Sequence, residues 1–267
     1  MKQPLLATLM TLGLAFSAPS NAHDMWLLPS STVLSGDSAW VLIDGAVSND
    51  KFYFDHRPLQ LDNLTISAPD GKAVTPQNPH TGHLRSSVDV QLTQPGTYTV
   101  ASVSDGVMAF WKENGKPKRW FGPANIMNQH VPADAAELRI AERHARTETY
   151  VTLGAPTPVN ASDKGLALRM LTHPNDLFAG ETANFVLLLN GQPAKQTEID
   201  IVPDGQRYRN AVNDVTLTTN DQGEFEVKWP QAGRYWLHAE HRDDQTTVPG
   251  AKTRNLSYTV TFEVLPQ

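Results

Sequence analysis

The stretch Gln94-Pro95-Gly96-Thr97-Tyr98-Thr99-Val100 decides the fold class of this chain. Its proline–glycine pair makes a tight turn, and the residues after that turn read as a β-strand. The same order of turn, glycine, tyrosine and strand returns in Gln231-Ala232-Gly233-Arg234-Tyr235-Trp236-Leu237. A turn that leads into a tyrosine-bearing strand is typical of β-sandwich domains. The recurrence therefore predicts two similar sandwiches joined in tandem.

Short strand patterns separated by turns recur in both halves of the chain, at residues 40–43, 64–66, 185–189 and 199–202. We therefore predict an all-β protein with two tandem Ig-like or prealbumin-like β-sandwich domains and a short mixed connection. The predicted N-terminal sandwich covers residues 23–122, the connection covers 123–160, and the C-terminal sandwich covers 161–267.

Two segments near the connection have a different character. Residues 107–120 mix aromatic and basic side chains around Asn114-Gly115, a pair that is typical of a hairpin turn. We interpret this segment as an aromatic hairpin that caps the first sandwich, and binding of a sugar, a base or a partner is the alternative. Residues 133–146 are rich in Ala, Glu and Arg, which predicts a short helix inside the connection.

The N-terminus has the pattern of a secretory signal peptide, residues 1–22. Lys2 supplies a positive charge, an apolar segment follows, and Ser20 and Ala22 are the small residues that precede a cleavage site. The signal is bacterial in style and predicts a periplasmic protein. Cleavage after Ala22 makes His23 the first residue of the mature chain. A terminal histidine offers an amine and an imidazole that chelate one metal ion, and such nitrogen ligands suit copper, nickel or zinc.

The composition limits the classes of function. The chain has 267 residues, a formal net charge of −6 and no cysteine. A mildly acidic protein is a poor partner for nucleic acid or for an anionic membrane. Without cysteine, a site for a soft metal depends on histidine or methionine. After the signal segment no second run of about 20 apolar residues follows, so the mature chain is expected to have no membrane span.

Several segments match a known pattern. Ala22-His23-Asp24-Met25-Trp26-Leu27-Leu28-Pro29 and the segments 149–157, 177–182, 219–225 and 258–264 resemble the NikM-like periplasmic family. That family is associated with nickel or cobalt uptake. The resemblance implies an accessory protein of metal acquisition that is built from β-sandwiches, with the leading histidine, His23, as a metal ligand. It also implies a metal-uptake transporter of the envelope as partner.

Other histidines are candidates for the remaining ligands. His238 and Glu240 point to one side of an extended strand while His241 points to the other, unless the strand ends there, as Asp243 and Asp244 suggest. His56 shares a predicted strand face with two phenylalanines. The candidate metal ligands are therefore His23, His56, His238 and His241.

These patterns predict a periplasmic accessory protein that binds a divalent transition metal, nickel, cobalt or copper, for uptake. One alternative is a non-catalytic envelope interaction module without metal. Another is a copper-dependent oxidative enzyme that uses the N-terminal histidine, by analogy with lytic polysaccharide monooxygenases. The sequence has no phosphate-binding loop, no nucleophile elbow and no zinc-helix motif, so we expect no enzyme of those classes.

Overall fold

The computed structural model describes residues 24–267, and these fold into three β-sheets. The first sheet has five strands in the order β1-β3-β7-β6, with β4 paired to β3. Their bounds are β1 (Asp24–Pro29), β3 (Ala39–Ser48), β4 (Arg57–Pro58), β6 (Gln77–Thr81) and β7 (Ser86–Leu92).

The second sheet runs through the whole molecule and has nine strands. Its order is β15-β14-β17-β18-β10-β8-β5, with β2 paired to β10 and β9 paired to β8. Their bounds are β2 (Val33–Leu34), β5 (Leu64–Ser67), β8 (Gly96–Glu113), β9 (Lys116–Gly122), β10 (Ala136–Leu153), β14 (Glu198–Pro203), β15 (Val215–Thr218), β17 (Gly233–Asp243) and β18 (Thr253–Val264).

The third sheet has four strands, in the order β11-β12-β13 with β16 on the other side of β12. Their bounds are β11 (Leu166–Met170), β12 (Thr182–Leu189), β13 (Gln192–Pro193) and β16 (Glu224–Lys228). Helix in the described residues is limited to three short 3₁₀ turns, η1 (Leu61–Asn63), η2 (Ala124–Gln129) and η3 (Gln206–Tyr208). The protein is all-β, as the sequence predicted.

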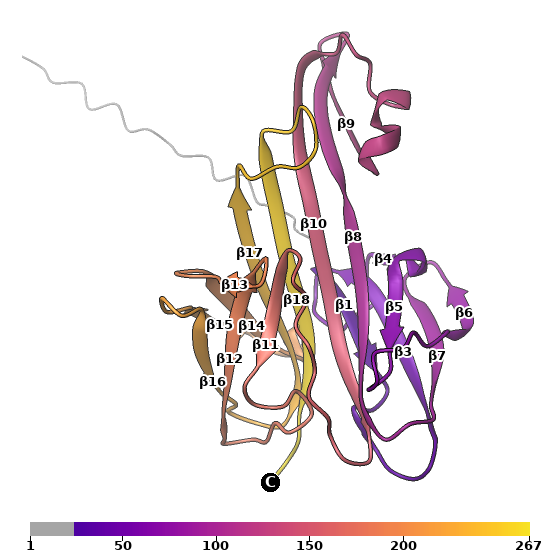
Figure 1. Ribbon diagram of the computed structural model, residues 1–267, viewed down its shortest axis with the longest axis vertical. Coiled ribbons are helices and arrows are strands. Elements are labelled where there is room, and N and C mark those ends of the chain that lie inside the picture. The colour runs from indigo at the N-terminus through magenta and orange to yellow at the C-terminus, as the bar shows by residue number, and fades with distance from the viewer. Residues whose placement is uncertain (1–23) are drawn as a thin grey trace, which may run out of the picture.

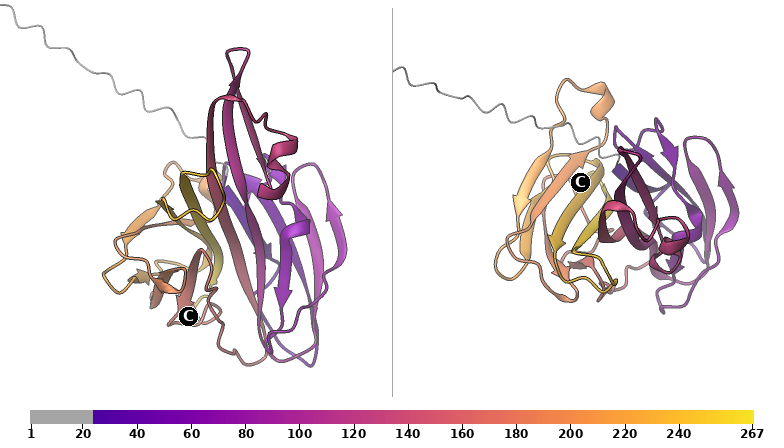
Figure 2. Two further views of the ribbon diagram at one scale, coloured as in Figure 1. Left: turned by 45° about the horizontal axis from the view of Figure 1, so that its top comes forward. Right: turned by 90° about the horizontal axis from the view of Figure 1, so that it is seen from above.

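The two sandwiches share the long central sheet. One sandwich is built on one face of this sheet, and the other sandwich is built on the opposite face. The first sheet covers one face and encloses a core with Leu27, Val90 and Tyr98. The third sheet covers the other face and encloses a core with Phe185 and Phe262. The two sandwiches stand side by side along this common sheet (Figure 2).

The turn–glycine–tyrosine stretches occupy equivalent places in the two sandwiches. Tyr98 is buried, and its hydroxyl donates to the carbonyl oxygen of Gln94 at 3.0 Å. Tyr235 is also buried and donates to the carbonyl oxygen of Gln231 at 2.8 Å. Each tyrosine thus closes a corner onto the backbone four residues upstream, the arrangement called a tyrosine corner in Ig-like sandwiches.

Strand β10 joins the two sandwiches, and it lies within the segment predicted as the connection. It pairs in parallel with β18 and antiparallel with β8 over most of its length. The helix predicted for residues 133–146 is wrong, because residues from Ala136 onward are strand. Ala, Glu and Arg are good helix formers, but helix propensities differ by less than about 1 kcal/mol per residue, and hydrogen bonding to two neighbouring strands outweighs that preference.

The hairpin at Asn114-Gly115 is confirmed, but it does not cap the first sandwich. Both residues have positive φ, 52° and 74°, as a primed hairpin turn requires. The distal ends of β8 and β10, together with β9, form an arm that projects beyond both sandwiches (Figure 1). Buried Ala109 and Trp111 pack there with Val131, which follows η2, so the arm has a small core of its own.

Candidate metal-binding cleft at the N-terminal strand

The first described residue, Asp24, lies at the edge of an open cleft. It begins β1 opposite Ser48 of β3, and its carboxylate forms an ion pair with Lys51. The cleft has a volume of about 600 Å³. Its lining includes residues of β1, β10, β14, β17 and β18, among them Asp24, Lys51, Arg143, Asp200, Asp214, Trp236, His238, Glu240 and Thr259. His23 lies outside the described residues.

Trp236 connects the N-terminal strand to this cleft. Its indole Nε1 donates to the carbonyl oxygen of Met25 at 3.0 Å. Lys51 Nζ lies 4.6 Å from the centroid of the Trp236 ring, and Trp236 belongs to a small buried cluster with Trp26 and Phe52. These contacts hold the start of β1 against β17, because a buried indole and its hydrogen bond allow little freedom of position.

His238 stands next to that tryptophan on β17 and is largely buried. The two rings stack with their centroids 4.9 Å apart. Nδ1 of His238 lies 3.0 Å from the Thr259 hydroxyl, and Nε2 lies 3.2 Å from a carboxylate oxygen of Glu240. The prediction that His238 and Glu240 share one side of a strand is therefore confirmed.

The charge balance of the cleft is mixed, with carboxylates in excess. The hydrogen bond from His238 lowers the pKa of Glu240, and the positive charges of His238 and Arg143 lower it further, against the opposing effect of burial. Asp200 and Asp214 add two further carboxylates to the lining, and Asp200 accepts a hydrogen bond of 2.8 Å from the Thr216 hydroxyl. The cleft therefore combines one imidazole with acidic oxygens, a ligand set that suits a divalent cation.

Within residues 24–267, no three histidine or acidic side chains are already gathered around a common point as a metal centre would need. His241 is on the other side of the strand from His238, and its Nε2 lies 3.6 Å from Asp243. Strand β17 continues through Asp243, so the expectation that it ends beside His241 is wrong. The two histidines point to opposite sides of β17, although both line a cavity of about 400 Å³ beside that strand.

His56 lies elsewhere as well. Residues 51–56 form a turn and loop between β3 and β4, so the strand face predicted for Phe52, Phe54 and His56 is wrong. The physical reason is the left-handed backbone at Phe52, with φ 62°, which turns the chain so that both phenylalanine rings contact Trp26. The His56 side chain is exposed and is not part of the cleft lining.

Sequence reasoning missed several residues of the cleft. Alternation along β17 already places Trp236 on the side of His238 and Glu240, so that residue could have been found. Lys51, Arg143 and Asp200 come from a loop, from β10 and from β14. No local pattern shows that these distant segments meet.

A family model described as a domain of unknown function, DUF4198, matches residues 20–243. The chain belongs to this family. The match to the DUF4198 family includes the N-terminal strand, the arm and all of β17, and hence most of the elements that line the cleft. No curated protein sequence matches the chain.

Solved structures show only distant likeness. The D0-D1 domain of intimin is 10% identical, covers 90% of this chain and 97% of its own, and has a TM-score of 0.22. The alpha-2-macroglobulin of E. coli is 12% identical, covers 94% of this chain and 14% of its own, and has a TM-score of 0.24. Scores this low indicate no function. None of the helices in residues 24–267 has the length and apolar character needed to cross a bilayer.

Proposed function

We propose that the mature protein is a periplasmic accessory protein that binds a divalent transition metal, nickel, cobalt or copper, through His23 and the cleft beside it. The observation that carries this proposal is the hydrogen bond between Trp236 and the Met25 carbonyl. It fixes the start of β1 next to His238, and Asp24 lines the same cleft as His238. The role is one of binding, without a chemical reaction.

In this proposal His23 acts at the edge of the cleft, because it is bonded to Asp24, which lines that cleft. After cleavage behind Ala22, its amine and imidazole supply two nitrogen ligands. His238 Nε2, now 3.2 Å from Glu240, supplies a third when it exchanges that partner for the metal. A set of nitrogens with carboxylates nearby suits nickel, cobalt or copper better than calcium or magnesium.

The biological setting follows from the N-terminal segment. Residues 1–22 have the pattern of a cleaved signal peptide, and the segment from Ala22 to Pro29 resembles proteins associated with nickel or cobalt uptake. In this proposal the protein collects the metal in the periplasm and passes it to an uptake transporter of the envelope. Acidification releases the metal, because amine and imidazole nitrogens bind only when deprotonated.

The test is titration of the mature protein with nickel, cobalt and copper, with His23 confirmed as the first residue by mass spectrometry. A second preparation carries one extra alanine before His23, which removes the free amine from the histidine. We expect tight binding to the native form and binding weakened by about 10–100-fold or more in the extended form. Binding that falls steeply between pH 7 and pH 5 is expected as well.

Single variants locate the other ligands. His238→Gln is expected to weaken binding about tenfold or more, while His56→Gln and His241→Gln serve as matched controls and leave it unchanged. Equal affinity of the native and the alanine-extended proteins would contradict the proposal. Unchanged affinity of the His238→Gln variant would keep His23 as a ligand but remove the cleft from the site.

A further inference from the structure

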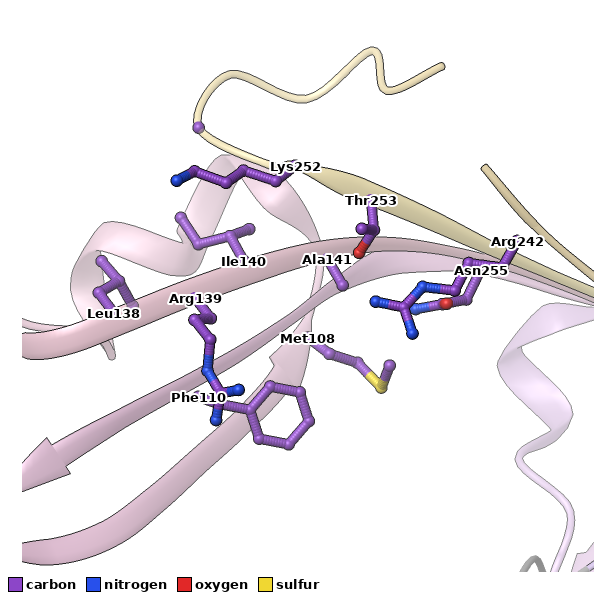
Figure 3. A pocket seen from close by; sticks show the side chains of 11 residues that line it. Met108, Phe110, Leu138, Arg139, Ile140, Ala141, Arg242, Lys252, Thr253 and Asn255 are labelled. Carbon is purple, nitrogen blue, oxygen red and sulfur yellow. The ribbon is translucent and has the colours of Figure 1, made fainter. Parts of the chain in front are cut away.

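The cleft continues along the same sheet face onto the arm as a groove. Two adjoining cavities of about 560 and 550 Å³ form it, the first of which is shown in Figure 3. We define the arm groove by its apolar and basic lining residues, Met108, Phe110, Arg139, Arg143, Arg242 and Lys252. It shares Arg143, Glu240 and Ser257 with the cleft, so the two are continuous.

Strand register explains why these side chains meet. Arg139 of β10 lies opposite Phe110 of β8, and Ala141 lies opposite Met108. Residues that face each other across a β-ladder point to the same side of the sheet, so the cation and the two apolar side chains share one face. Arg242 reaches the same groove from β17.

The four cations of the arm groove have no close ion pair, although Arg143 interacts with the charge of Glu240 over a longer distance. Within residues 24–267, no ion pair within 4.0 Å involves Arg139, Arg143, Arg242 or Lys252. The one acidic residue in the groove lining, Glu240, already contacts His238. The arm groove thus gathers four cations around one carboxylate, in a chain whose net charge is −6.

The surroundings of Arg143 also favour the binding of an anionic group. Burial lowers the pKa of this guanidinium, and repulsion from Arg57 lowers it further, with partial compensation from Glu240. Its guanidinium carbon also lies 5.3 Å from the centroid of the Phe121 ring. A guanidinium placed among other cations and an aromatic ring gains most from a carboxylate, which it binds with two parallel hydrogen bonds.

Apolar side chains complete the surface. Phe110 is 37% exposed, and it lies beside Met108 and Arg139 in the groove (Figure 3). The groove follows β18 from Thr253 to Ser257. At about 3.3 Å per residue this is the length of an extended segment of roughly five residues.

We propose that the arm groove binds an extended acidic peptide segment of a partner protein, with carboxylates on its arginines and an apolar side chain on Phe110. Charge complementarity selects the acidic residues, and the exposed phenylalanine selects the apolar one. An anionic membrane fits less well, because its charges lie in a plane whereas the arginines line a groove. The lining of the arm groove does not include His238, so the proposed peptide site lies beside that proposed metal ligand and meets the cleft at Glu240.

The test uses the full mature protein and the fluorescein-labelled peptide Glu-Glu-Phe-Glu-Glu, with binding followed by fluorescence anisotropy. The double variant Arg139→Gln/Arg242→Gln is expected to weaken binding at least tenfold. Phe110→Ser is expected to weaken it severalfold. The matched control is Arg169→Gln/Lys228→Gln, which removes two exposed cations of the third sheet and leaves binding unchanged. Binding to the unaltered protein should weaken as salt increases.

Three outcomes would overturn the proposal. The first is no binding of the acidic peptide to the unaltered protein. The second is equal weakening by the groove variant and by the control variant, which would show only a general effect of net charge. The third is binding to phosphatidylglycerol vesicles, lost in the groove variant, without binding to the peptide, which would identify a membrane surface instead. Circular dichroism of each variant confirms that it is folded.

Discussion

The two faces of strands β17 and β18 differ most in the part of these strands that lies nearest the arm. On one face, residues such as Leu237 and Phe262 are buried beneath the third sheet. On the other face, His238, Glu240 and Arg242 lie under no second sheet and line the cleft and the groove. Alternation along a strand assigns side chains to the two faces, but the covering sheet decides which face becomes core and which face is free to bind.

Strand β10 shows the same contrast along its length. Near its end, Tyr150 packs into one core and Val151 and Leu153 into the other, so both faces are covered. Toward the arm, Arg139 and Arg143 replace the apolar residues. The strand is therefore a structural element at one end and part of a candidate binding surface at the other.

The largest expected change in the free energy of unfolding comes from a substitution on the face that the third sheet covers. Phe262 is 1% exposed, and its ring stacks on Phe185 with centroids 5.4 Å apart. Phe262→Ala is expected to lower the free energy of unfolding by about 3–5 kcal/mol, because it removes apolar contacts and leaves a cavity. Urea unfolding at pH 7 measures this change. Ser257→Ala on the uncovered face of the same strand is the control. A comparable loss of unfolding free energy in the two variants would contradict the inference that only one face of the strand forms a core.

A smaller change in the free energy of unfolding is expected from a substitution of a polar residue on the covered face. Asp243 lies on the same side of β17 as Leu237, and two nitrogens of the Arg254 guanidinium donate to its carboxylate at 3.0 and 2.6 Å. Asp243→Asn is expected to cost about 2 kcal/mol at pH 7, because hydrogen bonds to charged groups have this magnitude.

This cost should depend on pH in a definite direction. The hydrogen bonds from Arg254 hold the pKa of Asp243 below its usual value despite partial burial. A folded-state pKa below the unfolded value gives stability that is fully present above about pH 4 and is lost as the pH falls through the folded pKa. The difference between the wild type and Asp243→Asn should therefore shrink in urea titrations at pH 3. A difference that stays constant from pH 7 to pH 3 would show that the charge of Asp243 is not its source.

The smallest change in the free energy of unfolding is expected from a substitution on the uncovered face. Arg242 is the chain neighbour of Asp243 but points into the arm groove, where it has no carboxylate partner within 4.0 Å among the described residues. Arg242→Gln is expected to change the free energy of unfolding by less than about 0.5 kcal/mol, as is usual for exposed positions. Arg254→Gln is the matched comparison and should cost several times more in the same urea titration. A loss above about 1 kcal/mol for Arg242→Gln would mean that this arginine stabilises the fold.

The sequence by itself determined the local features of the fold. The turns before Tyr98 and Tyr235 predicted two sandwiches, and in the structure both tyrosine hydroxyls bond to the backbone four residues upstream. Asn114-Gly115 predicted a hairpin, and strand alternation put His238 with Glu240. These features depend on residues close together in the chain, whose φ preferences and side-chain directions the amino-acid types largely specify.

Only the tertiary structure decided that β10 is a strand shared by both sandwiches, and that Lys51, Arg143 and Asp200 meet beside the N-terminal strand. The pairing of Ala141 with Thr253 joins segments far apart in the sequence. Hydrogen bonds and packing across such distances are not encoded in local propensity, and here they outweigh the helical preference of residues 133–146. The two candidate binding surfaces arise in the same way, because the exposed face of a sheet is defined by which other segments leave it uncovered.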